Sequence, residues 1–196
     1  MATRFDSIPN SMSRNLTWII AAISIIAPGL HLLSDILEWF NGGFSRPQLL
    51  INYAAFLMMP FVFIGLCAID WPRIGWIGLL GSALYTVSFI YFAHTTLLAI
   101  ELSIQDYEQL WSRLGGVYTL HGGLMIVGGL SFGIAAIRAR TLWTPGVVVF
   151  LAGIAINLFL ATLPVAEVWQ TVGSSFRNLG LIGIGIRRLY ANDGTE

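Results

Sequence analysis

Three ionisable residues recur at helical spacing inside an apolar stretch near the start of the chain. His31, Asp35 and Glu38 follow the pattern i, i+4, i+7, which places them on one face of an α-helix with 3.6 residues per turn. Carboxylic acids in apolar surroundings can exchange protons near neutral pH, and histidine is their common partner. The spacing therefore predicts general acid–base chemistry by Asp35 and Glu38, assisted by His31.

Similar polar faces recur in the later apolar stretches, where they add His94 and His121 to the catalytic candidates. A central charge in a membrane span costs about 2.5–3.5 kcal/mol on insertion scales, so such residues usually face a bundle interior and mark function. Ser174 and Arg177 share one such face, and Arg177 is expected to pair with Asp35 or Glu38 or to bind an anionic group. The substrate-binding candidates are Trp39, Asn52, Tyr53, Tyr91, Tyr118, Asn157, Gln170 and Arg177.

The composition indicates that the solvent around these residues is lipid. The chain has 196 residues, of which 56% are hydrophobic and 10% are charged, whereas soluble domains carry about 25% charged residues. The mean hydropathy is +0.77. A formal net charge of zero gives no electrostatic footprint for nucleic acid. The single cysteine, Cys67, excludes an internal disulfide, and the lack of lysine excludes Schiff-base chemistry.

Apolar segments of the length needed to cross a bilayer, about 20 residues each, occur six times. We expect an all-α bundle of six transmembrane helices forming a single domain, because the connections between the segments are short and polar. Glycines at positions 122, 123, 128 and 129 are expected to let helix backbones approach closely. The predicted spans lie near residues 17–39, 49–69, 74–100, 116–137, 145–163 and 166–186.

The distribution of arginine predicts the orientation of the bundle, because cytoplasmic loops collect basic residues. One side holds seven arginines and the other holds Arg46 and Arg113, so both termini are expected to be cytoplasmic. Tryptophans at the predicted span ends agree with these boundaries. The seven arginines are Arg4, Arg14, Arg73, Arg138, Arg140, Arg187 and Arg188.

This orientation gathers the polar side chains in the extracytoplasmic halves of the spans and leaves the cytoplasmic halves apolar. We therefore expect a polar cavity that opens to the extracytoplasmic side or laterally to lipid, above an apolar floor. A one-sided distribution of polar residues argues against a continuous pore, and the midplane lacks the broken helices typical of alternating-access carriers.

Three functions fit this pattern. The first is a membrane-embedded enzyme that acts on a lipid or isoprenoid-like substrate as a cyclase, isomerase, lyase or hydrolase, with no cofactor predicted and aromatic faces that stabilise a developing cation. The second is an intramembrane metal or haem site with His31, His94 and His121 as ligands. The third is a non-catalytic subunit that binds membrane lipids or assembles with other membrane proteins. The expected partners are membrane lipids and a hydrophobic small molecule, and nucleic acid is excluded.

Overall fold

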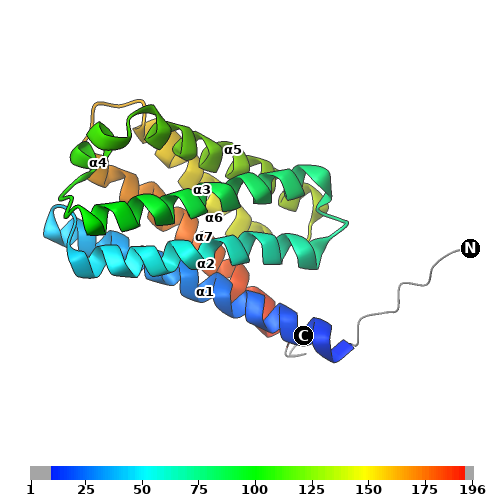
Figure 1. The fold of residues 1–196 in the computed structure, drawn as a ribbon. Helices are drawn as coiled ribbons and strands as arrows, with labels where there is room; N and C mark the ends of the chain where they lie inside the picture. Colours follow the sequence, from blue (N-terminus) through cyan, green and yellow to red (C-terminus); the bar gives the residue numbers. More distant parts are fainter. Residues whose placement is uncertain (1–9, 193–196) are drawn as a thin grey trace, which may run out of the picture.

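The computed structural model describes residues 10–192, without the side chains of residues 10–13, 167 and 192, and its regular structure in this range is helical. Each predicted segment overlaps one long helix, and α1 and α7 extend several residues beyond the expected limits (Figure 1). The elements are α1 (Asn10–Asn41), α2 (Arg46–Asp70), α3 (Gly75–Glu101), α4 (Tyr107–Leu114), α5 (Gly116–Ala139), α6 (Thr144–Leu160), the 3-10 turn η1 (Glu167–Trp169) and α7 (Gln170–Asn192).

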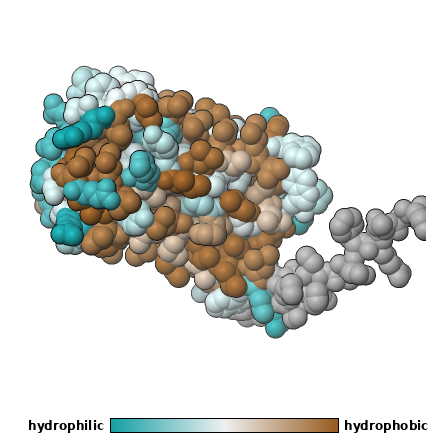
Figure 2. Space-filling model, in the orientation of Figure 1, coloured by the Kyte–Doolittle hydropathy of each residue, from teal (hydrophilic) through white to brown (hydrophobic). Residues whose placement is uncertain are grey.

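Four of these helices are long and apolar enough to cross a membrane: α1 from Arg14, α2, α3 and α5. Helix α6 is apolar but has 17 residues, and α7 is less apolar overall. Figure 2 shows a largely hydrophobic surface on the long side of the bundle that faces the viewer, with hydrophilic residues gathered toward the end that carries α4. Several long apolar helices of this kind indicate a multi-pass membrane protein. Arg4 lies outside the described residues.

The six long helices form a closed ring. Each long helix packs against the next long helix in the chain, and α7 packs against α1. The order around the ring is therefore α1, α2, α3, α5, α6, α7. The packing between α5 and α6 is the sparsest in the ring. Short connections make consecutive helices antiparallel, and the start of α1 and the end of α7 therefore lie at one end (Figure 1). We call this the terminal end and the opposite one the α4 end.

Aromatic side chains fill the interior of the bundle in its terminal half. Phe63, Tyr85, Phe132 and Phe150 come from four different helices, and each is at most 1% exposed. The ring centroids of Phe63 and Tyr85 are 4.0 Å apart, and those of Phe63 and Phe132 are 5.1 Å apart. This aromatic floor closes the interior toward the terminal end, which is the arrangement expected from the apolar composition of these helix halves.

Glycine lets α3 and α5 pack with their backbones almost in contact. A Cβ atom on Gly128 would lie 2.6 Å from the backbone nitrogen of Tyr85, and one on Gly129 would lie 2.4 Å from a side-chain carbon of Ile154. The expected close approach of two helix backbones is therefore found at Gly128, whereas an added Cβ on Gly129 would meet only the side chains of Ile154 and Tyr85. The expectation of close approach is wrong for Gly122 and Gly123, where no heavy atom lies within 4 Å of an added Cβ.

Helix α4 is an element that the sequence analysis did not predict. Asp106 caps its first turn, because its Oδ1 accepts a hydrogen bond of 2.9 Å from the Gln109 amide. Its one buried residue, Leu110, packs in a cluster with Leu49 of α2, Ala99 of α3 and Ile104 of the α3–α4 connection. This packing lays α4 across the end of the bundle.

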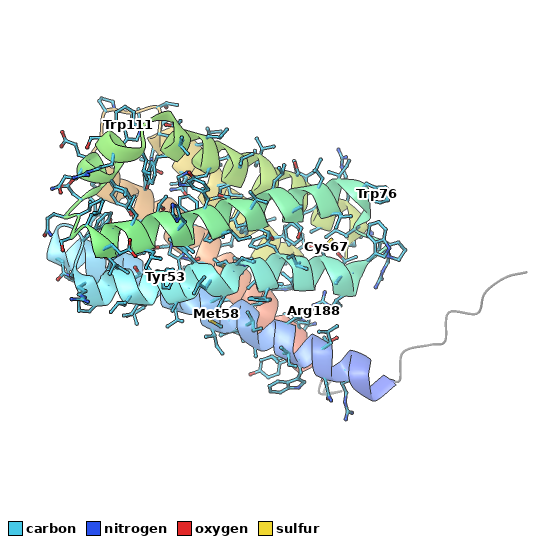
Figure 3. All side chains as sticks on the ribbon, in the orientation of Figure 1. Tyr53, Met58, Cys67, Trp76, Trp111 and Arg188 are labelled. Carbon is cyan, nitrogen blue, oxygen red and sulfur yellow. The ribbon has the colours of Figure 1, made fainter. Side chains whose placement is uncertain are left out.

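Polar and aromatic residues mark both ends of the ring. At the terminal end, Arg188 Nη2 lies 2.8 Å from both carboxylate oxygens of Asp70 and ties α7 to α2. Trp76 and Trp111 lie near opposite ends and are 75% and 54% exposed (Figure 3). Indole rings favour the membrane interface, so their positions agree with a bundle whose axis crosses the bilayer.

Candidate functional site

The interior of the bundle at the α4 end contains a cavity of about 420 Å³, within the range of roughly 300–1,000 Å³ typical of small-molecule sites. Every long helix of the ring and α4 contribute to its wall. Most of the wall is apolar, with aromatic rings prominent, and its acidic and basic side chains, His31, Asp35 and Arg177, come from α1 and α7. The apolar lining includes Phe44, Leu49, Phe56, Phe89, Phe92, Leu110, Trp111 and Ile126.

Seven of the thirteen predicted site residues line this cavity. They come from five of the six long helices, so the ring brings together polar residues that are far apart in the sequence. The seven are His31, Asp35, Asn52, Tyr118, Asn157, Gln170 and Arg177.

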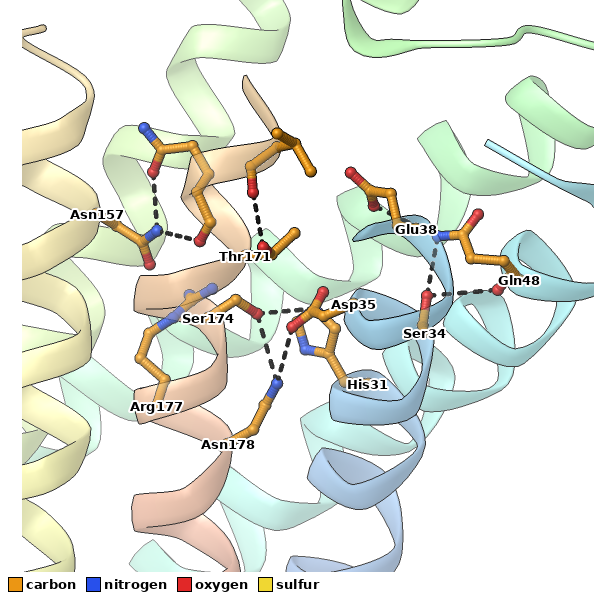
Figure 4. A network of polar contacts seen from close by, with 12 residues as sticks. His31, Ser34, Asp35, Glu38, Gln48, Asn157, Thr171, Ser174, Arg177 and Asn178 are labelled. Atoms are coloured by element: carbon orange, nitrogen blue, oxygen red, sulfur yellow. Dashed lines mark hydrogen bonds and ion pairs between the residues drawn. The ribbon is translucent and has the colours of Figure 1, made fainter. Parts of the chain in front are cut away.

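A cluster of four polar side chains joins α1 to α7 at the wall of the cavity (Figure 4). His31 Nε2 lies 3.6 Å from Asp35 Oδ1 and 3.3 Å from Ser174 Oγ. The side-chain amide of Asn178 donates to Asp35 Oδ2 at 3.5 Å and to Ser174 Oγ at 3.4 Å. We call these four residues the His31–Asp35 cluster, and they hold the Asp35 carboxyl group in place beside the cavity.

The geometry of this cluster differs from that of a serine hydrolase triad. In a triad, serine and aspartate bind opposite nitrogens of the histidine ring. Here Ser174 and Asp35 both meet Nε2 of His31, and its Nδ1 is buried without a partner. The arrangement therefore provides a carboxyl group with a histidine neighbour rather than an activated serine.

Arg177 is buried beside the same cavity and is 6% exposed. Its Nη1 donates to the Tyr85 hydroxyl at 3.4 Å and contacts the sulfur of Met125, whereas its Nε has no partner. The expected pairing with Asp35 or Glu38 is wrong, because no described carboxylate oxygen lies within 4 Å of the guanidinium.

Glu38 is 2% exposed, and the hydrogen bonds it accepts hold α4 in place. Its Oε2 accepts from the Tyr107 hydroxyl at 3.1 Å and from the Gln48 amide at 3.5 Å, and Gln48 also donates to Ser34 Oγ at 2.9 Å. Burial, followed by the charge of Glu38, raises the pKa of Tyr107 well above its ordinary value, so its phenol stays protonated and donates. We call Ser34, Glu38, Gln48 and Tyr107 the α4 clasp.

The clasp lies between two hollows. Tyr107 lines the main cavity and also an adjoining hollow of about 590 Å³ beneath the loops of the α4 end. Glu38 lines only the outer hollow, together with Gly42, Asp106 and Val168. The two carboxyl groups predicted to act together are thus separated by role, with Asp35 at the main cavity and Glu38 in the clasp.

The histidines predicted as alternative metal ligands do not come together. His94 is exposed on the outside of α3, and His121 packs among aromatic rings, with its centroid 4.4 Å from that of Phe92 and 5.0 Å from that of Tyr91. Among the side chains that the structure describes, no three histidine, cysteine, aspartate or glutamate residues are placed to share a metal ion. The described residues therefore do not assemble the three-histidine site that the sequence offers as an alternative.

The other aromatic candidates lie outside the cavity. Trp39 is 44% exposed, and its ring packs edge-on against Trp169 with centroids 5.4 Å apart. Tyr53 is half-buried against the aromatic core, and Tyr91 contacts the rings of His94 and His121.

Four polar residues of the site were missed by the sequence analysis: Ser34, Gln48, Tyr107 and Asn178. Asn178 follows Ser174 by one helical turn, and this spacing could have placed it in the cluster. Gln48 and Tyr107 lie close to helix starts that were read as turns or connections. Their contacts cross between helices and carry no local sequence signal.

Comparison with protein-family models, curated proteins and solved structures finds no match to this chain. The function is therefore argued from the geometry of the cavity itself.

Proposed function

We propose that the chain is a membrane-embedded enzyme that acts by acid–base catalysis on a hydrophobic, lipid-like or isoprenoid-like substrate held in the main cavity. The observation that carries the proposal is the position of Asp35. Among the described residues, its carboxyl group is the only one that lines the cavity, and it does so beside the His31 ring.

The chemistry of the wall fits a proton transfer to or from an apolar substrate. A positioned carboxyl group can donate or accept a proton in the transition state, and His31 is close enough to exchange that proton. The rings of Phe56, Phe89 and Phe92 present aromatic faces that favour a developing cation. An isomerase, cyclase, lyase or hydrolase would each use this combination.

The proposal assigns different roles to the remaining candidates. Ser174 and Asn178 orient Asp35 through the hydrogen bonds of the His31–Asp35 cluster. Glu38 acts as a positioning residue, because the clasp holds α4 over the cavity. His94 and His121 have no part in the reaction, since neither lines the cavity.

We further propose that all six long helices cross the membrane and that both termini are cytoplasmic. The closed ring supports six spans, because α6 and α7 complete it at the level of the other four. The excess of arginine at the terminal end supports the orientation. The main cavity then lies in the extracytoplasmic half of the bundle.

The enzymatic proposal is tested by following isotope from water into lipid. Purified protein is incubated with a total lipid extract of the organism that carries the chain, in D₂O and separately in H₂¹⁸O, and the lipids are compared by mass spectrometry. An isomerase or cyclase adds deuterium to carbon, whereas a hydrolase adds ¹⁸O. We expect label with the wild type and with Glu101→Gln, which removes an exposed carboxylate, and none with Asp35→Asn.

The same experiment separates catalysis from binding. Equal labelling by the wild type and Asp35→Asn would remove Asp35 from the reaction. An absence of label with every protein, while a lipid co-purifies with the wild type, would replace the enzyme with a lipid-binding protein.

A further inference from the structure

The guanidinium of Arg177 has an environment that no other described arginine shares. It is 6% exposed, it lines the main cavity, and its polar neighbours are the neutral Tyr85 hydroxyl and the Met125 sulfur. A buried cation without a counter-charge is strongly unfavourable in an apolar interior. By contrast, Arg188 at the terminal end is paired with Asp70 at 2.8 Å.

Unpartnered polar atoms gather around the same cavity. Four buried side chains that line it each have one polar atom without a hydrogen-bond partner: His31 Nδ1, Asn52 Oδ1, Asn157 Oδ1 and Arg177 Nε. Buried polar atoms in native proteins are almost always satisfied by protein, water or ligand. Their concentration around one cavity indicates that water or a bound molecule supplies their partners.

We propose that Arg177 binds the anionic head, a carboxylate or a phosphate, of an amphiphilic molecule whose apolar part fills the rest of the cavity. The inference rests on the proposed function only in identifying this molecule as the substrate. Arginine suits the role, because its planar guanidinium offers several donors that match the oxygens of either head group.

Among the side chains that the structure describes, no carboxylate forms an ion pair with Arg177. Asp35 is the nearest candidate on the wall, and its two oxygens already meet His31 Nε2 and the Asn178 amide. Each of the other described carboxylates is also more than 4 Å from Arg177. An anionic head at Arg177 would also lie next to the His31–Asp35 cluster, where the proposed proton transfer occurs.

The remainder of the cavity suits an apolar chain. Arg177 lies seven residues into α7, which is about 10 Å from the start of that helix at 1.5 Å per residue. The wall of the same cavity also carries Phe92, Ile126 and Leu110. Gly122 and Gly123 also line the cavity, and no heavy atom lies within 4 Å of an added Cβ at either position.

The test compares three probes that share one chain: dodecanoate, dodecyl phosphate and the neutral dodecan-1-ol. Binding to the purified protein in a neutral maltoside detergent is titrated by native mass spectrometry. We expect dodecanoate or dodecyl phosphate to bind the wild type at least tenfold more tightly than dodecan-1-ol, a difference of about 1.4 kcal/mol. Whichever anion shows the larger preference identifies the head group as a carboxylate or a phosphate.

Variants locate the effect at Arg177. Arg177→Gln is expected to bind the anions and the alcohol equally, whereas Arg138→Gln, which removes an exposed arginine at the terminal end, keeps the preference. Arg177→Lys retains the positive charge and is expected to keep part of the preference for anions. If the wild type binds both anions no more tightly than the alcohol, the inference is overturned, even if Arg177→Gln does not fold. A preference for anions that survives in Arg177→Gln also overturns it.

The outcome is independent of the isotope experiment. A preference for anions that depends on Arg177, without any labelling of lipid, keeps this inference and overturns the enzyme. Labelling that depends on Asp35, without a preference for anions, keeps the enzyme and overturns this inference.

Discussion

Tyr107 donates a hydrogen bond of 3.1 Å to Glu38 Oε2 and thereby joins two residues that are 69 positions apart in the chain. The bond ties the short helix α4 to the last turns of α1. Because Gln48 donates to both Glu38 and Ser34, the start of α2 is held in the same network. The α4 clasp therefore fixes the wall of the cavity at the end where α4 covers it.

We predict that Tyr107→Phe loosens this end of the bundle. The substitution removes one hydroxyl and leaves the buried Glu38 carboxyl with one partner fewer. A lost hydrogen bond of this kind costs about 1–3 kcal/mol, and we expect the free energy of unfolding in detergent to fall by that amount. Hydrogen exchange of the α4 amides should become faster, while that of the aromatic floor stays unchanged.

Tyr53→Phe is the matched control for this prediction. Tyr53 is half-buried, and its hydroxyl makes no hydrogen bond within the described part of the chain. We expect its removal to change the stability by less than about 0.5 kcal/mol. If Tyr107→Phe were as stable as Tyr53→Phe and exchanged no faster in α4, the clasp would have no role in holding that helix.

The long helices could be predicted from the sequence because each has an apolar stretch long enough to span a bilayer. Helix α4 could not be found this way, because its eight residues are too few and too polar to stand out. Its signals are local ones: Asp106 at the cap, and Leu110 and Leu114 one turn apart. They became meaningful only where the ends of α2 and α3 supply an apolar surface for Leu110.

The site could be predicted only as far as helical spacing reaches. The i, i+4 relation of His31 and Asp35 correctly puts them together, because both lie on one helix. Spacing does not say which face of an apolar helix points inward, and His94 on α3 turns out to be exposed. Nor does it give the relative depth of residues on different helices, so Arg177 meets Tyr85 instead of a carboxylate.

We predict that Gly153→Ala disturbs Arg177 through its backbone. A Cβ atom on Gly153 would lie 2.5 Å from the Arg177 backbone nitrogen and 2.5 Å from the Gly173 carbonyl oxygen. Helices α6 and α7 must then separate at this level. Such overpacking costs about 1–3 kcal/mol, and the preference for dodecanoate over dodecan-1-ol should weaken because the guanidinium moves.

Gly123→Ala provides the comparison for that variant. An added Cβ on Gly123 meets no heavy atom within 4 Å, and alanine favours the helix by up to about 1 kcal/mol over glycine. We therefore expect Gly123→Ala to unfold at the same temperature as the wild type or at a higher one. Equal melting temperatures for Gly153→Ala and Gly123→Ala would show that α6 and α7 tolerate separation and do not fix Arg177.

The orientation of the ring is tested by the accessibility of single cysteines. The native Cys67 is 2% exposed and is first replaced by Cys67→Ala. Ser112→Cys on α4 and Arg138→Cys at the terminal end of α5 then place one exposed thiol at each end of the bundle. We expect a membrane-impermeant maleimide to label Ser112→Cys in intact cells and Arg138→Cys only after permeabilisation.

The physical reason for this pattern is the length of the helices between the two thiols. Helix α5 has 24 residues and spans about 36 Å at 1.5 Å per residue, which exceeds the hydrocarbon core of about 30 Å. The reverse pattern would place the termini outside the cell and contradict the arginine distribution. Labelling of both thiols in intact cells would show that the bundle does not cross the membrane along its axis, and the cavity would then have no defined side.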